Sequence, residues 1–212
     1  SLKFISNKAV SDEEKITFGI RKIETYMNEK GHRGFKLNGK EVLIKGAGWT
    51  DDIFLRDNDS TNEIQVRYVK HMNLNTIRFE NIWGSSRNVY SLCDSLGIMA
   101  MVGWSCQWEW ENYLGKRCDE YGGIRTKKDM DLAVAYLNDQ IRYLQNHPSI
   151  FVWMLGSDML PRPALEKRYR QLIDSIDNRP YVAAASKRTS TISGPTGVKM
   201  NGPYNYVGPS YW

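Results

Sequence analysis

Apolar and polar residues follow two different periods along this chain, and the two periods predict most of its elements. Residues 15–24 alternate between apolar and polar side chains, as expected for a strand with one buried face. Residues 35–42 form two short strand segments around Asn38 and Gly39, the strongest local signal for a hairpin. Because a lone strand cannot bury its apolar face, we interpret residues 1–33 as the C-terminal strand and linker of a preceding β-sandwich.

Strands and helices alternate from residue 42 onward. Short apolar runs predict strands, and apolar residues spaced three and four apart predict the helices between them. This βαβ rhythm indicates an α/β fold with a parallel sheet. The predicted strands are 42–48, 76–79, 98–102, 150–155 and 181–185, and the helices are centred on 61–72, 89–96, 130–144 and 165–176.

Two architectures fit this order of elements, namely an open doubly wound sheet and a (β/α)8 TIM barrel. No GxGxxG or Walker sequence follows any predicted strand, which weakens the nucleotide-binding, doubly wound version. A complete barrel takes about 250 residues, more than residues 34–212 supply. We therefore predict that residues 34–212 form the N-terminal part of a TIM barrel, with about five to six of the eight strands.

Charge and cysteine content exclude several function classes. The 29 basic and 24 acidic residues give a net charge of +5 without a basic stripe, so we expect no nucleic-acid partner. No stretch approaches the roughly 20 apolar residues of a membrane span. Cys93, Cys106 and Cys118 form neither a CxxC pair nor a Cys/His ligand set, so we predict no metal and no cofactor. A bridge between Cys106 and Cys118 stays open.

Acidic side chains follow each of the first four predicted barrel strands, where barrels carry their reactive groups. Paired carboxylates beside tryptophan, without a histidine cluster, favour hydrolysis of a glycosidic bond. Asp and Glu also cap helices and decorate loops, so any single one of them can be structural. The candidates are Asp51 and Asp52 after the first strand, Glu80 and Asn81 after the second, Trp104, Trp108, Glu109 and Glu111 after the third, and Ser157 and Asp158 after the fourth.

Three motifs carry a resemblance to a known family. They are residues 18–21 (FGIR), 35–40 (FKLNGK) and 146–156 (NHPSIFVWMLG). Together they resemble glycoside hydrolase family 2, in which an immunoglobulin-like β-sandwich leads into a catalytic TIM barrel. The resemblance implies that residues 1–33 are the tail of that sandwich.

One departure from the family pattern narrows the resemblance. Most members have Asn-Glu after the fourth strand, with the Glu as general acid/base, whereas this sequence has Ser157-Asp158. That pair resembles the exo-β-D-glucosaminidase (exo-chitosanase) branch, and β-galactosidases and β-mannosidases are poorer matches. The supporting motifs are 46–52 (GAGWTDD), 78–84 (RFENIWG), 103–111 (GWSCQWEWE) and 158–163 (DMLPRP).

The resemblance implies a retaining hydrolase of β-linked glucosamine with Asp158 as general acid/base. A glucosamine unit carries a cation at neutral pH, so we expect at least one of Glu80, Glu109 and Glu111 to bind the amino group. Alternation over residues 108–111 places Glu109 and Glu111 on one side.

Aromatic residues are plentiful, with seven Trp and twelve Tyr. We interpret Trp153, inside the fourth strand, as core, and the tryptophans at strand ends as platforms for a sugar ring. The C-terminal stretch resembles the family loop on the acceptor side of the cleft, although an aromatic packing cluster would look alike. The platform candidates are Trp49, Trp104, Trp108 and Trp110, and the candidates on the C-terminal stretch are Tyr204, Tyr206, Tyr211 and Trp212.

The resemblance also implies that a second carboxylate, the nucleophile, is a Glu on a later strand. No Glu follows Glu166 and no Asp follows Asp177. We therefore expect residues 1–212 to be an inactive fragment whose partners are the remaining domains of a periplasmic or secreted parent. The alternatives are a β-mannosidase or β-galactosidase type of family 2 hydrolase, and a non-catalytic carbohydrate-binding module.

Overall fold

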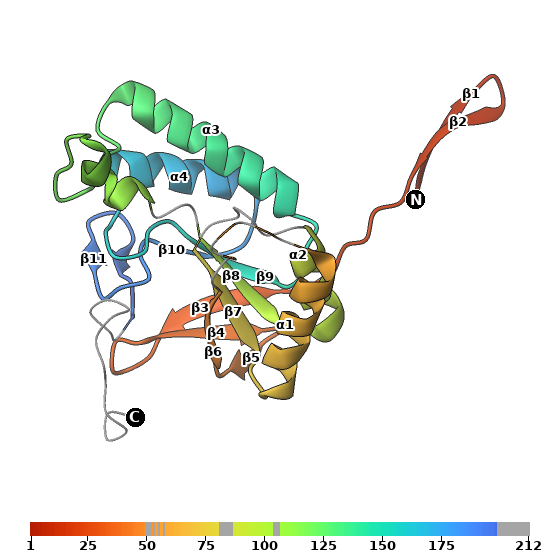
Figure 1. Ribbon diagram of the computed structural model, residues 1–212, viewed down its shortest axis with the longest axis horizontal. Coiled ribbons are helices and arrows are strands. Elements are labelled where there is room, and N and C mark those ends of the chain that lie inside the picture. The colour runs from red at the N-terminus through yellow and green to blue at the C-terminus, as the bar shows by residue number, and fades with distance from the viewer. Residues whose placement is uncertain are drawn as a thin grey trace.

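A five-stranded parallel sheet forms the centre of the molecule in the computed structural model (Figure 1). The structure describes residues 1–49, 52, 54, 56, 58–80, 87–103 and 107–198. The sheet order β10-β9-β8-β7-β6 follows the chain, and every neighbouring pair is parallel. This arrangement confirms the predicted α/β fold, with the strands of an incomplete barrel. The strands are β6 (Gly46–Trp49), β7 (Thr76–Phe79), β8 (Met99–Gly103), β9 (Ile150–Met154) and β10 (Tyr181–Val182).

Four helices cover one face of this sheet, in the places that the apolar spacing predicts. The side chain of Asn58 caps the first helix through the Thr61 N–H, and Thr126 forms a capping box with Asp129 at the third. Gly97 ends the second helix with a φ of 68°, a left-handed conformation that favours glycine. The helices are α1 (Asp59–His71), α2 (Arg87–Leu96), α3 (Lys127–Leu144) and α4 (Pro163–Ile176).

Two predicted barrel strands differ by more than one residue from their bounds in the structure. The predicted strand 42–48 divides, because antiparallel pairing ends at Val42 and parallel pairing with β7 begins only at Gly46. The predicted strand 181–185 shortens to β10. Beyond β10 the chain still follows the end of β9, since the Ala185 N–H donates to the Gly156 carbonyl over 3.0 Å.

The N-terminal region differs more from its prediction. Residues 2–14 form an exposed antiparallel hairpin that projects from the rest of the molecule, whereas residues 15–22 form no strand, so the prediction of a strand over 15–24 is wrong there (Figure 1). The hairpin at Asn38 and Gly39 is confirmed, with φ of 51° and 80°. The strands of this region are β1 (Leu2–Ser6), β2 (Ala9–Glu14), β3 (Ile23–Met27), β4 (Arg33–Leu37) and β5 (Lys40–Val42).

Strands β3, β4 and β5 form one antiparallel sheet, so a division of the chain at residue 33 falls within it. Phe35 of β4 packs edge-on against Phe151 of β9, with 5.0 Å between the ring centroids. This contact places the small sheet against the parallel sheet. The assignment of residues 1–33 to a β-sandwich stays a prediction.

The two faces of the parallel sheet carry different side chains. On β7, Ile77 and Phe79 belong to the main core with the helices, whereas Arg78 points to the other face. Trp153 is buried in the main core, as predicted, and its indole N–H donates to Asp177. The alternation on β7 places a cation and the following Glu80 on the same, inner side of the sheet.

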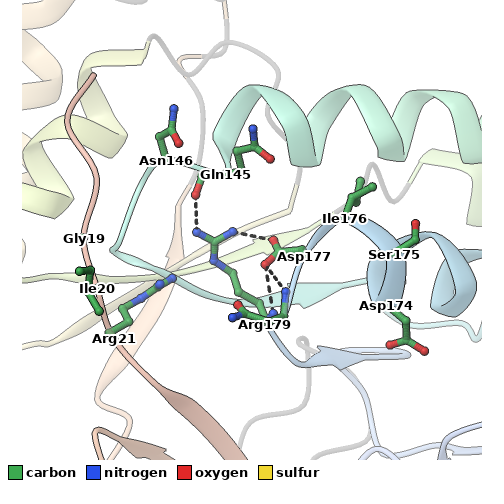
Figure 2. Close-up of a pocket in the computed structure, with 11 residues that line it drawn as sticks. Gly19, Ile20, Arg21, Gln145, Asn146, Asp174, Ser175, Ile176, Asp177 and Arg179 are labelled. Atoms are coloured by element: carbon green, nitrogen blue, oxygen red, sulfur yellow. Dashed lines mark hydrogen bonds and ion pairs between the residues drawn. The ribbon is translucent and has the colours of Figure 1, made fainter. Parts of the chain in front are cut away.

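At the amino ends of β9 and β10, a cleft of about 640 Å³ contains a network around Arg179 (Figure 2). The guanidinium donates to Asp177 over 2.6 Å, to the carbonyl of Ile150 over 2.9 Å and to that of Gln145 over 2.7 Å. Arg21, from the extended N-terminal segment, also donates to the Ile150 carbonyl. Arg179 thus ties the end of α3, the start of β9 and the end of α4 together.

Candidate active site

The carboxyl ends of β7, β8 and β9 bring three predicted acidic residues together on one edge of the sheet. Glu80 directly follows β7, and Ser157-Asp158 follows β9 after a two-residue extension. Glu109 ends a 3-10 helix, η1 (Gln107–Glu109), after β8. Because parallel strands end on the same edge, residues far apart in sequence meet here.

Arg78 links Glu80 to Ser157. One guanidinium nitrogen donates to Oε1 of Glu80 over 2.8 Å, and the other terminal nitrogen donates to Oγ of Ser157 over 2.9 Å. The Ser157 hydroxyl lies 3.3 Å from the same Glu80 oxygen. The Glu80 side chain is 38% exposed, and its bond to Arg78 fixes the direction of the carboxylate.

Asp158 is half-buried at the same edge. Its Oδ1 lies 3.3 Å from the Ser186 hydroxyl, and its backbone carbonyl accepts a hydrogen bond from Nε of Arg188 over 2.8 Å. A role as helix cap does not apply to it, since the N-cap of α4 is Arg162. The Asp158 carboxyl therefore stands at a strand end without a capping role in α4.

Glu109 lies beneath the other acids, with an exposed fraction of only 1%. Its Oε1 accepts a hydrogen bond from the backbone N–H of Ser157 over 2.5 Å, and its Oε2 accepts one from the N–H of Asp158 over 2.9 Å. Burial raises the pKa of Glu109, the backbone bonds oppose that shift, and the charge of Asp158 adds to it. Glu109 thus binds backbone and presents no open face to a sugar.

Two further predictions from residues 108–111 do not fit their structure. Instead of alternating, Glu109 and Glu111 lie in successive 3-10 helices, and Glu111, the first residue of η2 (Glu111–Leu114), pairs with Lys116 over 2.7 Å. Trp108 is 5% exposed and belongs to the main core, so its ring is not open as a platform. The spacing misleads because tight 3-10 turns replace extended chain.

Asp52 is exposed and supports a turn. Its Oδ1 accepts hydrogen bonds from the backbone N–H groups of Phe54 over 2.9 Å and Arg56 over 3.2 Å, and these bonds hold the pKa of Asp52 below its usual range. This is the local pattern of an Asx turn.

Of the predicted ring platforms, Trp49 packs against the core, 5.7 Å from Phe79 between ring centroids, whereas Trp110 is 41% exposed. The remaining predicted residues lie outside the described part of the chain, and so does Cys106 with its proposed bridge to Cys118. These residues are Asp51, Asn81, Trp104, Tyr204, Tyr206, Tyr211 and Trp212.

Three residues of the site were missed from the sequence as individual contacts, namely Arg78, Ser186 and Arg188. Arg78 had a usable signal, because a cation between the apolar Ile77 and Phe79 must point inward and needs a carboxylate partner. Ser186 donates to the Ser157 carbonyl over 2.7 Å. Nothing local in the sequence marks Ser186 or Arg188, since their contacts depend on how the chain after β10 returns to β9.

Within the described residues, no group of three or more His, Cys, Asp or Glu side chains is arranged to hold a metal ion. Among these same residues, no helix has the length and apolarity to cross a membrane. Carboxylates gathered at the carboxyl ends of an α/β sheet of barrel type define the class of a TIM-barrel glycosidase domain.

Comparison with known proteins identifies the family within this class. The family model "Glycosyl hydrolases family 2, TIM barrel domain" matches residues 30–192. The chain therefore belongs to glycosyl hydrolase family 2, which confirms the resemblance seen in the sequence motifs.

Two curated relatives are exo-β-D-glucosaminidases. That of Amycolatopsis orientalis is 36% identical over 203 residues, which cover 95% of this chain and 19% of the relative. That of Streptomyces avermitilis is 37% identical over 207 residues, 97% of this chain and 23% of the relative. The chain thus spans about a fifth to a quarter of the length of these relatives.

A solved structure shows the same fold over nearly the whole chain. It is a complex of a variant of the Amycolatopsis orientalis exo-chitosanase CsxA with PNP-β-D-glucosamine. The TM-score is 0.84 at 35% identity, and the match covers 97% of this chain and 24% of that one.

Proposed function

We propose that the protein containing this chain is an exo-β-D-glucosaminidase, which hydrolyses β-glycosidic bonds of terminal glucosamine units with retention of configuration. The observation that carries the proposal is the Ser157-Asp158 pair at the end of β9, next to Glu80 at the end of β7. The names of the relatives, and the glucosamine derivative in the CsxA complex, support the choice of substrate.

Asp158 is the proposed general acid/base. A carboxylic acid in this role donates its proton to the leaving oxygen and later removes a proton from the attacking water. Its half-buried position at a strand end meets the need for access to substrate on one side and protein on the other. Retention also needs a nucleophilic carboxylate about 5 to 5.5 Å from the acid, which we propose is a Glu outside residues 1–212.

Glu80 is the proposed contact for the substrate's amino group. Of the three glutamates considered for that contact, Glu109 is 1% exposed and bonded to backbone, and Glu111 is 25% exposed in η2. Both Glu80 and Glu111 pair with a cation, but Glu80 is the most exposed of the three, at 38%, and directly follows a strand of the sheet, β7. An ionised carboxylate there repays the desolvation of an ammonium group and offers nothing comparable to a neutral hydroxyl.

The test is hydrolysis of matched aryl β-glycosides by the full natural polypeptide that carries residues 1–212. The set comprises the glucosaminide, glucoside, N-acetylglucosaminide, mannoside and galactoside, with D158N as the variant that lacks the proposed acid and E80Q as the specificity variant. We expect activity confined to the glucosaminide, a large loss of it in D158N, and reduced discrimination between glucosaminide and glucoside in E80Q.

Other outcomes separate the alternatives. Mannoside or galactoside activity would keep the family and reject the amino-group site. Sugar binding without turnover by the full polypeptide would favour a binding module. Turnover by residues 1–212 alone, lost in D158N, would move the nucleophile to Glu80, Glu109 or Glu111.

A further inference from the structure

The backbone of Ser157 and Asp158 is held from two sides. On one side the N–H groups of these two residues donate to the two oxygens of Glu109, at 2.5 and 2.9 Å. On the other side the Ser157 carbonyl accepts from the Ser186 hydroxyl and backbone N–H, and the Asp158 carbonyl accepts from Arg188. The side chain of Asp158 leaves from a backbone whose orientation is fixed.

We propose that Glu109 is a positioning residue, whose buried carboxylate orients the Ser157–Asp158 backbone so that the Asp158 side chain faces the leaving group. This inference rests on the proposed function of Asp158. It gives Glu109 a different role from the amino-group contact expected from the sequence, because a carboxylate that is 1% exposed and bonded to two backbone amides does not reach substrate.

The length of the acid explains why its backbone needs such support. The Asp side chain is one methylene shorter than that of Glu, so the position of its carboxyl depends more directly on the backbone. A misplacement of a catalytic group by 1 Å costs on the order of 100-fold in rate. A bidentate carboxylate under two successive N–H groups restricts both translation and rotation of the peptide.

The preceding glycine shows how closely this turn is packed. A Cβ built on Gly156 would lie 2.2 Å from the Met159 carbonyl oxygen, 3.1 Å from that of Ala183 and 3.3 Å from Oε1 of Glu109. Only glycine fits without moving the turn. The Glu109 carboxylate is therefore one wall of the turn that carries the acid, and a change in it is transmitted to Asp158.

The decisive experiment uses E109Q in the full natural polypeptide. The amide keeps size and one acceptor, but its NH2 group meets one of the two backbone N–H donors, so one bond is lost and the peptide shifts. The readout is kcat/KM for β-glucosaminides with a good leaving group (dinitrophenol) and a poor one (a simple alcohol), because only the poor one needs a proton from the acid.

We expect E109Q to lower kcat/KM at least about tenfold for the poor leaving group and less than about threefold for the good one, with substrate affinity unchanged. The matched control is E166Q. Glu166 is also 1% exposed and accepts a short bond, 2.5 Å from the Ser190 hydroxyl, but it lies on α4 and this bond does not involve the backbone of Ser157 or Asp158. E166Q should lower both kcat/KM values by the same factor, if it lowers them at all.

An equal loss for both leaving groups in E109Q, as in E166Q, would overturn the proposal. If E109Q does not fold, E109D supplies the test, since it keeps the charge but withdraws the carboxylate by one methylene and should show a smaller loss with the same dependence on leaving group. An equal loss of kcat/KM for both leaving groups in E109D would also reject the proposal.

The variant D158N distinguishes failure of this inference from failure of the proposed function. If D158N shows no dependence on the leaving group, Asp158 is not the acid and the proposed function falls. If the loss of kcat/KM depends on the leaving group in D158N but not in E109Q, only the positioning role of Glu109 is rejected.

Discussion

The two edges of the parallel sheet use buried charge in opposite ways. At the amino edge, Asp94 accepts a hydrogen bond from the Ser149 N–H over 2.9 Å, and its other oxygen lies 2.7 Å from Nδ1 of His147. Burial alone would raise the pKa of Asp94, but these partners outweigh it and hold the pKa below its usual range. At the carboxyl edge, burial and the nearby Asp158 raise the pKa of Glu109.

The difference between these two pKa shifts distinguishes acids that stabilise the fold from acids kept for function. A lowered pKa means that the folded state favours the ionised acid, so the charge stabilises the fold, whereas a raised pKa means that ionisation costs stability. The carboxyl edge brings Glu80, Glu109 and Asp158 together, and the raised pKa of Glu109 means that this edge keeps a destabilising charge where the chemistry is proposed. The amino edge compensates with networks such as that of Arg179.

The largest expected effect comes from breaking that compensation. Arg179→Met should lower the free energy of unfolding by about 3–5 kcal/mol, because it leaves Asp177 buried without its cation. The two side chains are only 4% and 5% exposed. Urea unfolding measures the change. The double variant R179M/D177N should lose less than the two single changes added together, and a loss below about 1 kcal/mol in R179M would contradict the assigned role of the network.

A crowded glycine at the carboxyl edge comes next. A Cβ on Gly103 would lie 2.5 Å from the Glu80 carbonyl oxygen and 2.7 Å from that of Phe79. Gly103→Ala should therefore destabilise the fold by about 2 kcal/mol and displace Glu80. The control is Gly48→Ala on β6, two strands away in the same sheet, where a Cβ would meet no atom of the described residues within 4 Å. Equal unfolding midpoints for the two variants would show that this edge tolerates the added methyl group.

The sequence predicted the barrel elements well because their signals are local. Apolar spacing, the Gly97 cap and the unbroken run of β9 each depend on neighbours within a few residues. The strand predicted over 15–24 failed where the same alternation had no sheet to join in the described structure. The alternation of apolar and polar residues shows which face of a strand would be buried, but it does not show whether another strand is present to pair with it.

The candidate site was predictable in outline and not in its assignment of roles. The rule that parallel strands end together found Glu80, Glu109 and Asp158. It did not separate the acid that faces outward from the one beneath it, because that depends on the 3-10 turn at η1 and on backbone N–H groups 48 residues further along the chain. Contacts of that range have no local signature.

A pH comparison of the two edges gives the next smaller effect. D94N should cost about 1–3 kcal/mol at neutral pH. The gap to the parent protein should shrink as the pH falls below about 4, because the unfolded parent then binds a proton at Asp94 that the folded parent, with its lowered pKa, does not yet bind. E109Q should behave oppositely: relative to E109Q, the parent loses stability as the pH rises above about 4, because Glu109 ionises in the unfolded state before it does so in the folded state, where its pKa is raised. Urea midpoints from pH 3 to 7 measure both, and parallel curves would contradict the contrast between the edges.

The smallest effect is expected for a charge pair of similar geometry outside both edges. On α1, Nε of Arg67 lies 2.8 Å from Oε1 of Glu63, close to the 2.6 Å of Arg179 and Asp177, but these side chains are 61% and 47% exposed. R67A should cost at most about 0.5 kcal/mol, less at high salt, because water already solvates both charges. Urea unfolding at low and high salt measures this. A loss near that of R179M would mean that distance rather than burial sets the strength of these pairs. The comparison of the two edges depends on a contrast between exposed and buried charge, and that contrast would then no longer hold.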